Sequence, residues 1–243
     1  MIRLAVLDFS GLKSDFNPAS LGEKERFRIE TTKNEKKRLE RLASRLLLQR
    51  IYQESFSADM PEIEYESFGR PHFSEIDGER RVSFSISHSE KLCALFISDE
   101  KNVGADMELI CEDTARIERA QARFLKNLDE ESRKKLFGNG LFDFDLSFYG
   151  FSHGKIEKLE DYLGISLLCE GGDRDETFTL KWERFSEKEE KHLAWTGLES
   201  VVKLHGKGLS DSKNVNNYLQ KSTVLPFVLQ HGGLSWAVSL AIE

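Results

Sequence analysis

Proline and cysteine are scarce in this 243-residue sequence, which has 4 prolines and 3 cysteines. So few prolines exclude a proline-rich linker. With 39% hydrophobic and 32% charged residues, the composition is typical of a globular protein rather than a disordered or fibrous one. The cysteines, Cys93, Cys111 and Cys169, are odd in number and lack metal-ligand spacing, so we expect reduced structural thiols rather than disulfides or a zinc site.

Long apolar runs and an excess of positive charge are also missing. No run approaches the ~20 apolar residues of a membrane-spanning helix, and the start, MIRLAVLDFS, reaches an acidic residue too early for a secretory signal. The sequence therefore predicts a cytoplasmic protein that does not enter membranes. Its formal net charge of −7 argues against a protein that binds nucleic acid mainly through the charge of the phosphate backbone.

The first part of the sequence predicts a strand and then a helix. Residues 2–9 are apolar enough for a strand. The charged tract from residue 24 to 53 is predicted to be one amphipathic helix, because its leucines recur at three- and four-residue steps. Arg38, Arg41 and Arg45 lie on adjoining faces of this helix. Its basic side is therefore expected to face solvent or an anion.

The rest of the sequence mixes strand and helix patterns. An antiparallel meander is predicted for three segments joined by short polar turns, residues 81–90, 92–100 and 102–110. Helices are predicted at 115–137 and from 186 to the glycines at 206 and 208. Between them, the β-rich section 138–185 contains an alternating segment, 141–149, and a predicted hairpin, 164–185. A closing hairpin is predicted at 223–242. The length suits one large α+β domain or two tightly packed halves.

Two carboxylates interrupt the apolar segment VGADMELI, residues 103–110. On a strand, Asp106 and Glu108 point to the same face about 6.6 Å apart, because each residue rises ~3.3 Å. They repel each other unless a cation lies between them. Mg²⁺ suits this arrangement, since it prefers oxygen ligands at about 2.1 Å and often takes one or two protein carboxylates with phosphate and water. The alternative is an exposed edge strand with ordinary surface acids.

Glu199 and Lys203 lie four positions apart in the predicted helix and therefore share a face. A surface ion pair is the ordinary interpretation of this spacing. Combined with Asp106 and Glu108, however, a third carboxylate and a lysine form a set that can hold a metal ion and a phosphate together.

Ser87 and His88 lie at the end of the predicted strand 81–90. A hydroxyl and an imidazole there, with Arg70 in the segment GRPHF, are suited to contact a phosphate. A serine hydrolase would need a base and an orienting acid that the sequence does not place beside Ser87. Anion contact is therefore the favoured interpretation.

Five segments, taken in order, resemble the motif series of the 4'-phosphopantetheinyl transferase superfamily, in its surfactin-synthetase-activating type: GRPHF, FSISHS, VGADMELI, ARFL and WTGLESVVKLHGKGL. That family typically has Gly-Lys/Arg-Pro, Asn/Ser-Ile-Ser-His-Ser, Gly-Ile-Asp-Ile-Glu, and Trp-Thr-x-Lys-Glu followed by Lys and Gly-Lys-Gly-Leu. GEKERF and RLERLASRLLLQR are similar to its N-terminal basic segment. The resemblance covers residues 24–50, 69–125 and 190–209.

This resemblance implies an α+β fold of two similar halves related by a pseudo-twofold axis, each an antiparallel sheet packed with a long helix. The halves would be residues 1–104 and 105–243, the second with a β-rich insertion at 138–185. Coenzyme A would bind between them. Its 4'-phosphopantetheine group would move, in a Mg²⁺-dependent reaction, to a serine of an apo acyl or peptidyl carrier protein, leaving 3',5'-ADP. The family is also expected to be monomeric.

The resemblance also implies roles for individual residues. Asp106, Glu108 and Glu199 match the metal-binding carboxylates, and Glu199 also matches the residue that deprotonates the incoming serine. Lys203 matches the lysine beside the diphosphate. The matches to contacts at the nucleotide end of coenzyme A, with His88 near the 3'-phosphate, are Lys24, Arg41, Arg45, Arg70, Ser87 and His88.

Two features depart from the family pattern. Leu198 stands where the family has lysine, which removes one positive charge from the expected site. The spacing between Asp106 and Glu199 is also longer than in the family, and the excess falls in residues 138–185. These departures leave open a coenzyme A or carrier-protein binding homologue with impaired catalysis. A Mg²⁺ nuclease also uses clustered acids, but the acidic balance and the lack of a basic, aromatic strand-binding tract weigh against it.

Overall fold

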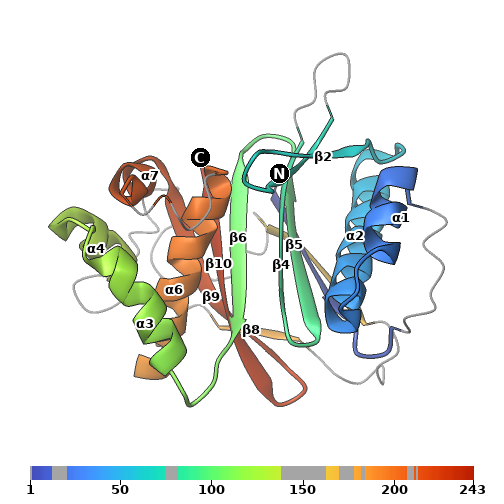
Figure 1. Ribbon diagram of the computed structural model, residues 1–243. Helices are drawn as coiled ribbons and strands as arrows, with labels where there is room; N and C mark the ends of the chain where they lie inside the picture. The colour runs from blue at the N-terminus through green and yellow to red at the C-terminus, as the bar shows by residue number, and fades with distance from the viewer. Residues whose placement is uncertain are drawn as a thin grey trace.

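The computed structural model describes residues 2–12, 21–74, 82–137, 163–169, 178–181, 184–206, 211 and 213–243. They form the predicted α+β fold, with two four-stranded sheets at the centre and helices outside them (Figure 1). Within this described part of the chain, no helix combines the length and the apolar character needed to cross a membrane.

The first sheet has the strand order β4-β5-β1-β7. β5 pairs antiparallel with β4 and β1, whereas β7 pairs parallel with β1. The strands are β1 (Ile2–Asp8), β4 (Ser83–Ser89), β5 (Leu92–Ser98) and β7 (Leu163–Cys169). Apolar side chains of helix α2 (Glu35–Phe56) pack on this sheet. Helix α1 (Glu23–Glu30) precedes α2, and a short hairpin of β2 (Ile63–Tyr65) and β3 (Pro71–Phe73) follows it.

The second sheet has the order β6-β10-β9-β8 and is antiparallel throughout. Its strands are β6 (Val103–Leu109), β8 (Thr179–Lys181), β9 (Thr223–His231) and β10 (Leu234–Ile242). Helix α6 (Glu187–Leu204) covers its outer face (Figure 1). The smaller helices beyond α6 are α3 (Ala115–Leu125), α4 (Glu130–Phe137) and α7 (Val215–Lys221).

Several predicted elements are confirmed. Strand 2–9 is β1, and the closing hairpin is formed by β9 and β10. The predicted helix 24–53 is divided into α1 and α2, and α2 extends to Phe56. Helix α6 begins at a capping box made by Ser186 and Glu189 and ends before Gly206, whose φ of 65° suits a glycine. The predicted helix 115–137 is divided into α3 and α4.

Two predicted strand pairings are wrong. β6 does not continue a meander with β5, because it pairs with β10 in the second sheet. β7 and β8 do not form a hairpin, because β7 pairs with β1 and β8 pairs with β9. A period of two fixes which face a side chain occupies, but not the partner of the strand. The predicted segment 141–149 lies outside the described residues, and the predicted boundary after residue 104 falls inside β6.

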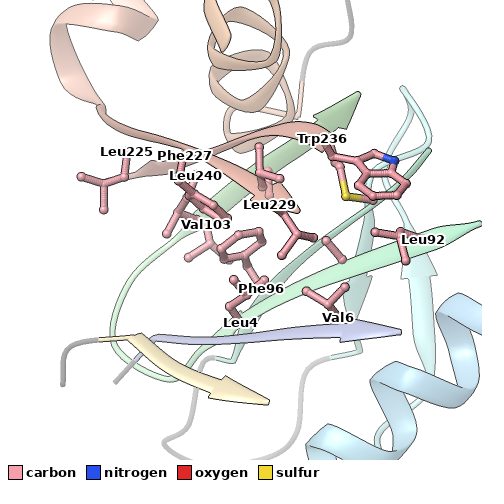
Figure 2. Close-up of a cluster of buried hydrophobic side chains, with 14 of the residues drawn as sticks. Leu4, Val6, Leu92, Phe96, Val103, Leu225, Phe227, Leu229, Trp236 and Leu240 are labelled. Carbon is pink, nitrogen blue, oxygen red and sulfur yellow. The ribbon is translucent and has the colours of Figure 1, made fainter. Parts of the chain in front are cut away.

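A layer of apolar side chains fills the space between the two sheets (Figure 2). It includes Leu4 of β1 and Phe227 of β9, and the odd-numbered residues of β6 enter it as well. Because successive side chains of a strand point to opposite faces, the even-numbered Gly104, Asp106 and Glu108 point to the other face of β6, where α6 lies. Alternation therefore places the two acids under the helix.

A row of serines joins the two sheets where β4 lies beside β6 (Figure 1). The serine row consists of Ser83, Ser85, Ser87 and Ser89. Each hydroxyl accepts a hydrogen bond of 2.8 to 3.1 Å from a backbone N–H of β6. These side chains take the place of a neighbouring strand's carbonyls at the edge of β6, where unpaired N–H groups would otherwise remain.

Candidate metal centre

Three carboxylates from β6 and α6 converge at one place. Asp106, Glu108 and Glu199 each offer one oxygen atom, and these atoms all lie within 4.8 Å of one another. Asp106 is only 3% exposed, and the two glutamates are half-buried. The structure thus brings together the three residues that the sequence singles out as metal ligands. We call them the acid cluster.

Gly104 explains how α6 approaches the strand so closely. A Cβ atom at this position would lie 2.3 Å from the backbone oxygen of Ser200 and 2.4 Å from the backbone nitrogen of Leu204. Backbone atoms of a packed helix cannot move aside as a flexible side chain could. Since Gly104 and Asp106 share a face of β6, the glycine lets α6 rest directly on the strand and carry Glu199 to Asp106.

The two oxygens of Asp106 have different surroundings. Oδ1 accepts hydrogen bonds from Lys203 Nζ at 2.6 Å and from Ser87 Oγ at 2.9 Å. Oδ2 is buried and has no hydrogen-bond partner among the described residues. A buried polar atom without a partner is destabilising. A bound cation is one group that would satisfy Oδ2.

Ionisation of all three acids would give the acid cluster more negative charge than Lys203 alone can neutralise. Burial and the neighbouring Asp106 carboxylate raise the pKa of Glu199 to about 9, and the same two causes raise the pKa of Glu108. Burial alone would lower the pKa of Lys203, but Asp106 and Glu199 outweigh it and raise that pKa. All three shifts indicate a site that favours added positive charge, from protons or from a cation.

The donor set fits a small, hard cation. The acid cluster offers carboxylate oxygens alone, and Mg²⁺ prefers oxygen ligands and commonly completes its shell with water and phosphate. The buried, unpartnered Oδ2 of Asp106 is consistent with that use. Asp106, Glu108 and Glu199 are therefore suited to hold a small divalent cation, a class that includes Mg²⁺.

Arg116 of α3 is a neighbour of the acid cluster that sequence reasoning missed. Its Nη2 atom donates to Glu108 Oε1 at 3.0 Å, and its side chain is 78% exposed. An arginine near the start of a predicted helix gives no signal that separates it from other surface arginines. Such an exposed ion pair adds little stability, but it places a guanidinium at the rim of the acid cluster.

Ser87 contacts the acid cluster directly, whereas His88 and Arg70 have other partners. His88 points to the opposite face of β4 from Ser87, and its Nδ1 lies 3.7 Å from Glu40 of α2. Burial lowers the pKa of His88, although Glu40 opposes the shift. Arg70 Nη1 donates at 2.6 Å to the carbonyl of Leu204. Arg70 thereby ties the β2-β3 hairpin to the C-terminal end of α6, where the helix dipole favours a cation.

Lys24 and Arg41 lie in the helical N-terminal region and have partners of their own. Lys24 Nζ donates to Glu62 at 2.6 Å in an exposed ion pair. Arg41 donates to the hydroxyl of Thr32 at 2.8 Å, which connects α2 to the segment after α1. Their contacts to a nucleotide stay predictions.

Arg45 is buried rather than on a basic surface. It is 8% exposed and donates to Glu25 of α1 at 2.5 Å and to the hydroxyl of Tyr65 at 2.8 Å. Of the two surroundings predicted for the basic side of this helix, solvent or an anion, Arg45 has the second, and the anion is the Glu25 carboxylate of the protein itself. Sequence spacing could not reveal this, because Glu25 lies on a different helix.

Leu198 is fully buried among the apolar residues that α6 shares with α3, α4 and α7. Its neighbour Glu199 joins Asp106 instead. The expectation that this substitution removes a charge from the site assumed that position 198 faces the acid cluster. In the structure, the Leu198 side chain belongs to the core.

No protein-family model matches the chain, and no curated protein matches it. The resemblance of the five motif segments therefore stays a prediction, and function has to be inferred from the residues themselves.

Proposed function

We propose that the protein transfers the 4'-phosphopantetheine group of coenzyme A to a serine of an apo acyl or peptidyl carrier protein, with Mg²⁺ as cofactor. The observation that carries this proposal is the convergence of the acid cluster within 4.8 Å, with Lys203 Nζ 2.6 Å from Asp106 Oδ1. These residues come from two motif segments that are far apart in the sequence. Both segments resemble the transferase family at the positions where that family holds its metal.

The reaction forms a bond between the serine Oγ and the phosphorus next to pantetheine, and it breaks the bond from that phosphorus to the oxygen that leaves with 3',5'-ADP. Such phosphoryl transfer needs charge neutralisation and positioning more than covalent help. A Mg²⁺ ion held by Asp106, Glu108 and Glu199 would supply neutralisation of the diphosphate.

Lys203 and Glu199 would supply the protein's own part of the chemistry. The raised pKa of Lys203 keeps its ammonium group charged at neutral pH, so that it can orient the diphosphate. Glu199 would accept the proton of the incoming serine, which requires its ionised form. Since a nearby cation lowers the pKa of a carboxyl group, the pKa of about 9 implies that this base becomes available once a cation is bound.

The proposal includes two similar halves related by a pseudo-twofold axis, and the topology supports it. In the first sheet, β1 is followed by α2 and the β4-β5 hairpin, and β5 pairs with β1. In the second sheet, β6 is followed by α6 and the β9-β10 hairpin, and β10 pairs with β6. Coenzyme A would bind between these halves of a cytoplasmic monomer, which would meet the carrier protein as its partner.

The test is incubation of the purified protein with coenzyme A, Mg²⁺ and a panel of apo carrier proteins, followed by mass spectrometry of each carrier. We expect one carrier or more to gain a phosphopantetheine group, and EDTA to prevent the gain. Glu199→Gln and Asp106→Asn should abolish transfer. The matched control is Glu187→Gln, at an 84% exposed position of the same helix, which should keep it.

Two outcomes would count against the proposal. Transfer that persists in Glu199→Gln or Asp106→Asn would refute the metal assignment. Binding of coenzyme A without a mass gain on any carrier would favour the catalytically impaired binding homologue.

A further inference from the structure

Three protein groups saturate the hydroxyl of Ser87. It accepts hydrogen bonds from the Met107 N–H at 3.1 Å and from Lys203 Nζ at 3.3 Å, and it lies 2.9 Å from Asp106 Oδ1. A serine hydroxyl has one proton and two lone pairs. Because two nitrogen donors occupy the lone pairs, the proton is directed to Asp106.

These hydrogen bonds occupy Oδ1 of Asp106 and leave Oδ2 available to a cation. Oδ1 is held by Ser87 from β4 and by Lys203 from α6, so rotation of the carboxylate would break both bonds. Oδ2 is buried and lacks a hydrogen-bond partner among the described residues. Ser87 and Lys203 therefore fix the orientation of the Asp106 carboxylate, and Oδ2 remains free to bind a cation.

We propose that Ser87 is a positioning residue, which orients the Asp106 carboxylate for cation binding. The inference rests on the metal site of the proposed function, and it assigns Ser87 a different role from the nucleotide contact that the family resemblance implies. A bond from Ser87 to a nucleotide phosphate would need the proton that Asp106 now receives. Partners that orient a metal ligand commonly contribute 10- to 100-fold to metal affinity.

Ser85 is a matched control in the same serine row. Its hydroxyl accepts a hydrogen bond from the Ala105 N–H at 2.8 Å, as Ser87 does from Met107. The two serines are similarly buried, at 8% and 6% exposure. Among the described residues, Ser87 is the member of the row that bonds to Asp106. Alanine at either position therefore removes one acceptor for β6, but alanine at 87 also releases the carboxylate.

The experiment measures Mn²⁺ binding to the full chain by electron paramagnetic resonance of the unbound ion, without coenzyme A. Ser87→Ala should weaken Mn²⁺ binding about 10- to 100-fold, whereas Ser85→Ala should stay close to the wild-type affinity. The melting temperature of metal-free Ser87→Ala should fall at least as far as that of Ser85→Ala, because Ser87 also loses its bonds to Asp106 and Lys203. Equal Mn²⁺ affinities of the two alanine variants would overturn the inference.

A second pair of variants decides the matter if alanine at 87 impairs folding. Ser87→Thr keeps a hydroxyl and Ser87→Val has nearly the same shape without one, and both suit a strand. Threonine should bind Mn²⁺ about as well as the wild-type protein, and valine should weaken binding about 10- to 100-fold, as alanine does. Equal binding by the two variants would refute the role of the hydroxyl. Wild-type protein that binds Mn²⁺ but modifies no carrier would refute the proposed function alone. Wild-type protein that does not bind Mn²⁺ would refute the metal site and the inference together.

Discussion

Replacing Glu199 by glutamine should change how the stability of the metal-free protein depends on pH. In the folded protein, burial and Asp106 raise the pKa of Glu199 from its ordinary 4.5 to about 9. A group with a raised folded pKa stabilises the fold fully below its unfolded pKa. This contribution is lost as the pH rises towards 9, because the unfolded chain releases its proton first. Glutamine does not titrate, so the free energy of unfolding of the variant should not decline with pH for this reason.

The expected magnitude follows from the size of the pKa shift. One pKa unit corresponds to about 1.4 kcal/mol, so between pH 4.5 and 7 this group should lower the free energy of unfolding of the wild-type protein by about 3 kcal/mol. At pH 7 without metal, Glu199→Gln should therefore be the more stable protein by up to about 3 kcal/mol. For a chain of this length, that difference corresponds to a melting temperature roughly 6 to 12 °C higher.

The assay is urea unfolding at several pH values from 5 to 8, in EDTA and then in Mg²⁺. In EDTA the free energy of unfolding of the wild-type protein should decline with pH more steeply than that of Glu199→Gln. Mg²⁺ should stabilise the wild-type protein and leave the variant nearly unchanged, since a ligand stabilises only the form that binds it. The control Glu187→Gln should follow the wild-type protein. Parallel pH dependences of the wild-type protein and Glu199→Gln would refute the reasoning.

Four further substitutions test the packing around the acid cluster and the buried ion pair of Arg45. Gly104→Ala forces a Cβ atom to within 2.3 Å of the backbone of α6, so it should lower the melting temperature and weaken Mn²⁺ binding. Gly197→Ala, with its nearest neighbour at 3.4 Å, should be neutral or stabilise by up to about 1 kcal/mol. Leu198→Lys should cost about 2 to 5 kcal/mol in urea unfolding, because it removes a buried leucine and buries an amine; a neutral effect would show that position 198 reaches solvent. Arg45→Met should cost about 3 to 5 kcal/mol by leaving Glu25 buried without its partner, and unchanged unfolding would contradict this role.

The faces of the strands were predictable from the sequence, but their partners were not. Alternation along VGADMEL separates the core residues from Asp106 and Glu108, and this separation is what the structure has. The same alternation fits β6 beside β5 as well as beside β10, so the meander was a reasonable but wrong choice. The alternating serines of β4 were the overlooked signal. A strand face lined with hydroxyls suits side-chain hydrogen bonds to a neighbour better than contact with an apolar core.

The members of the acid cluster were predictable because their spacing carries chemistry. Two acids at period two and a glutamate four positions before a lysine define faces, and the fold then only has to bring those faces together. Ion pairs between different elements carry no such spacing. Arg45 meets Glu25 from another helix, and Arg116 of α3 meets Glu108 of β6 across the loop between them. Pairs of this kind depend on how helices pack, which local periodicity does not determine.

The charge of the acid cluster leads to one more expectation, the release of protons when a cation binds. Three ionised carboxylates would carry three negative charges, and Lys203 neutralises one of them. The pKa of about 9 at Glu199 means that the metal-free protein retains a proton on this carboxyl group at pH 7. A dication would replace that proton, so Mg²⁺ binding at pH 7 should release about one proton. Calorimetric titration in buffers of different ionisation enthalpy measures this number, and binding without proton release would contradict the assignment of Glu199 as a ligand.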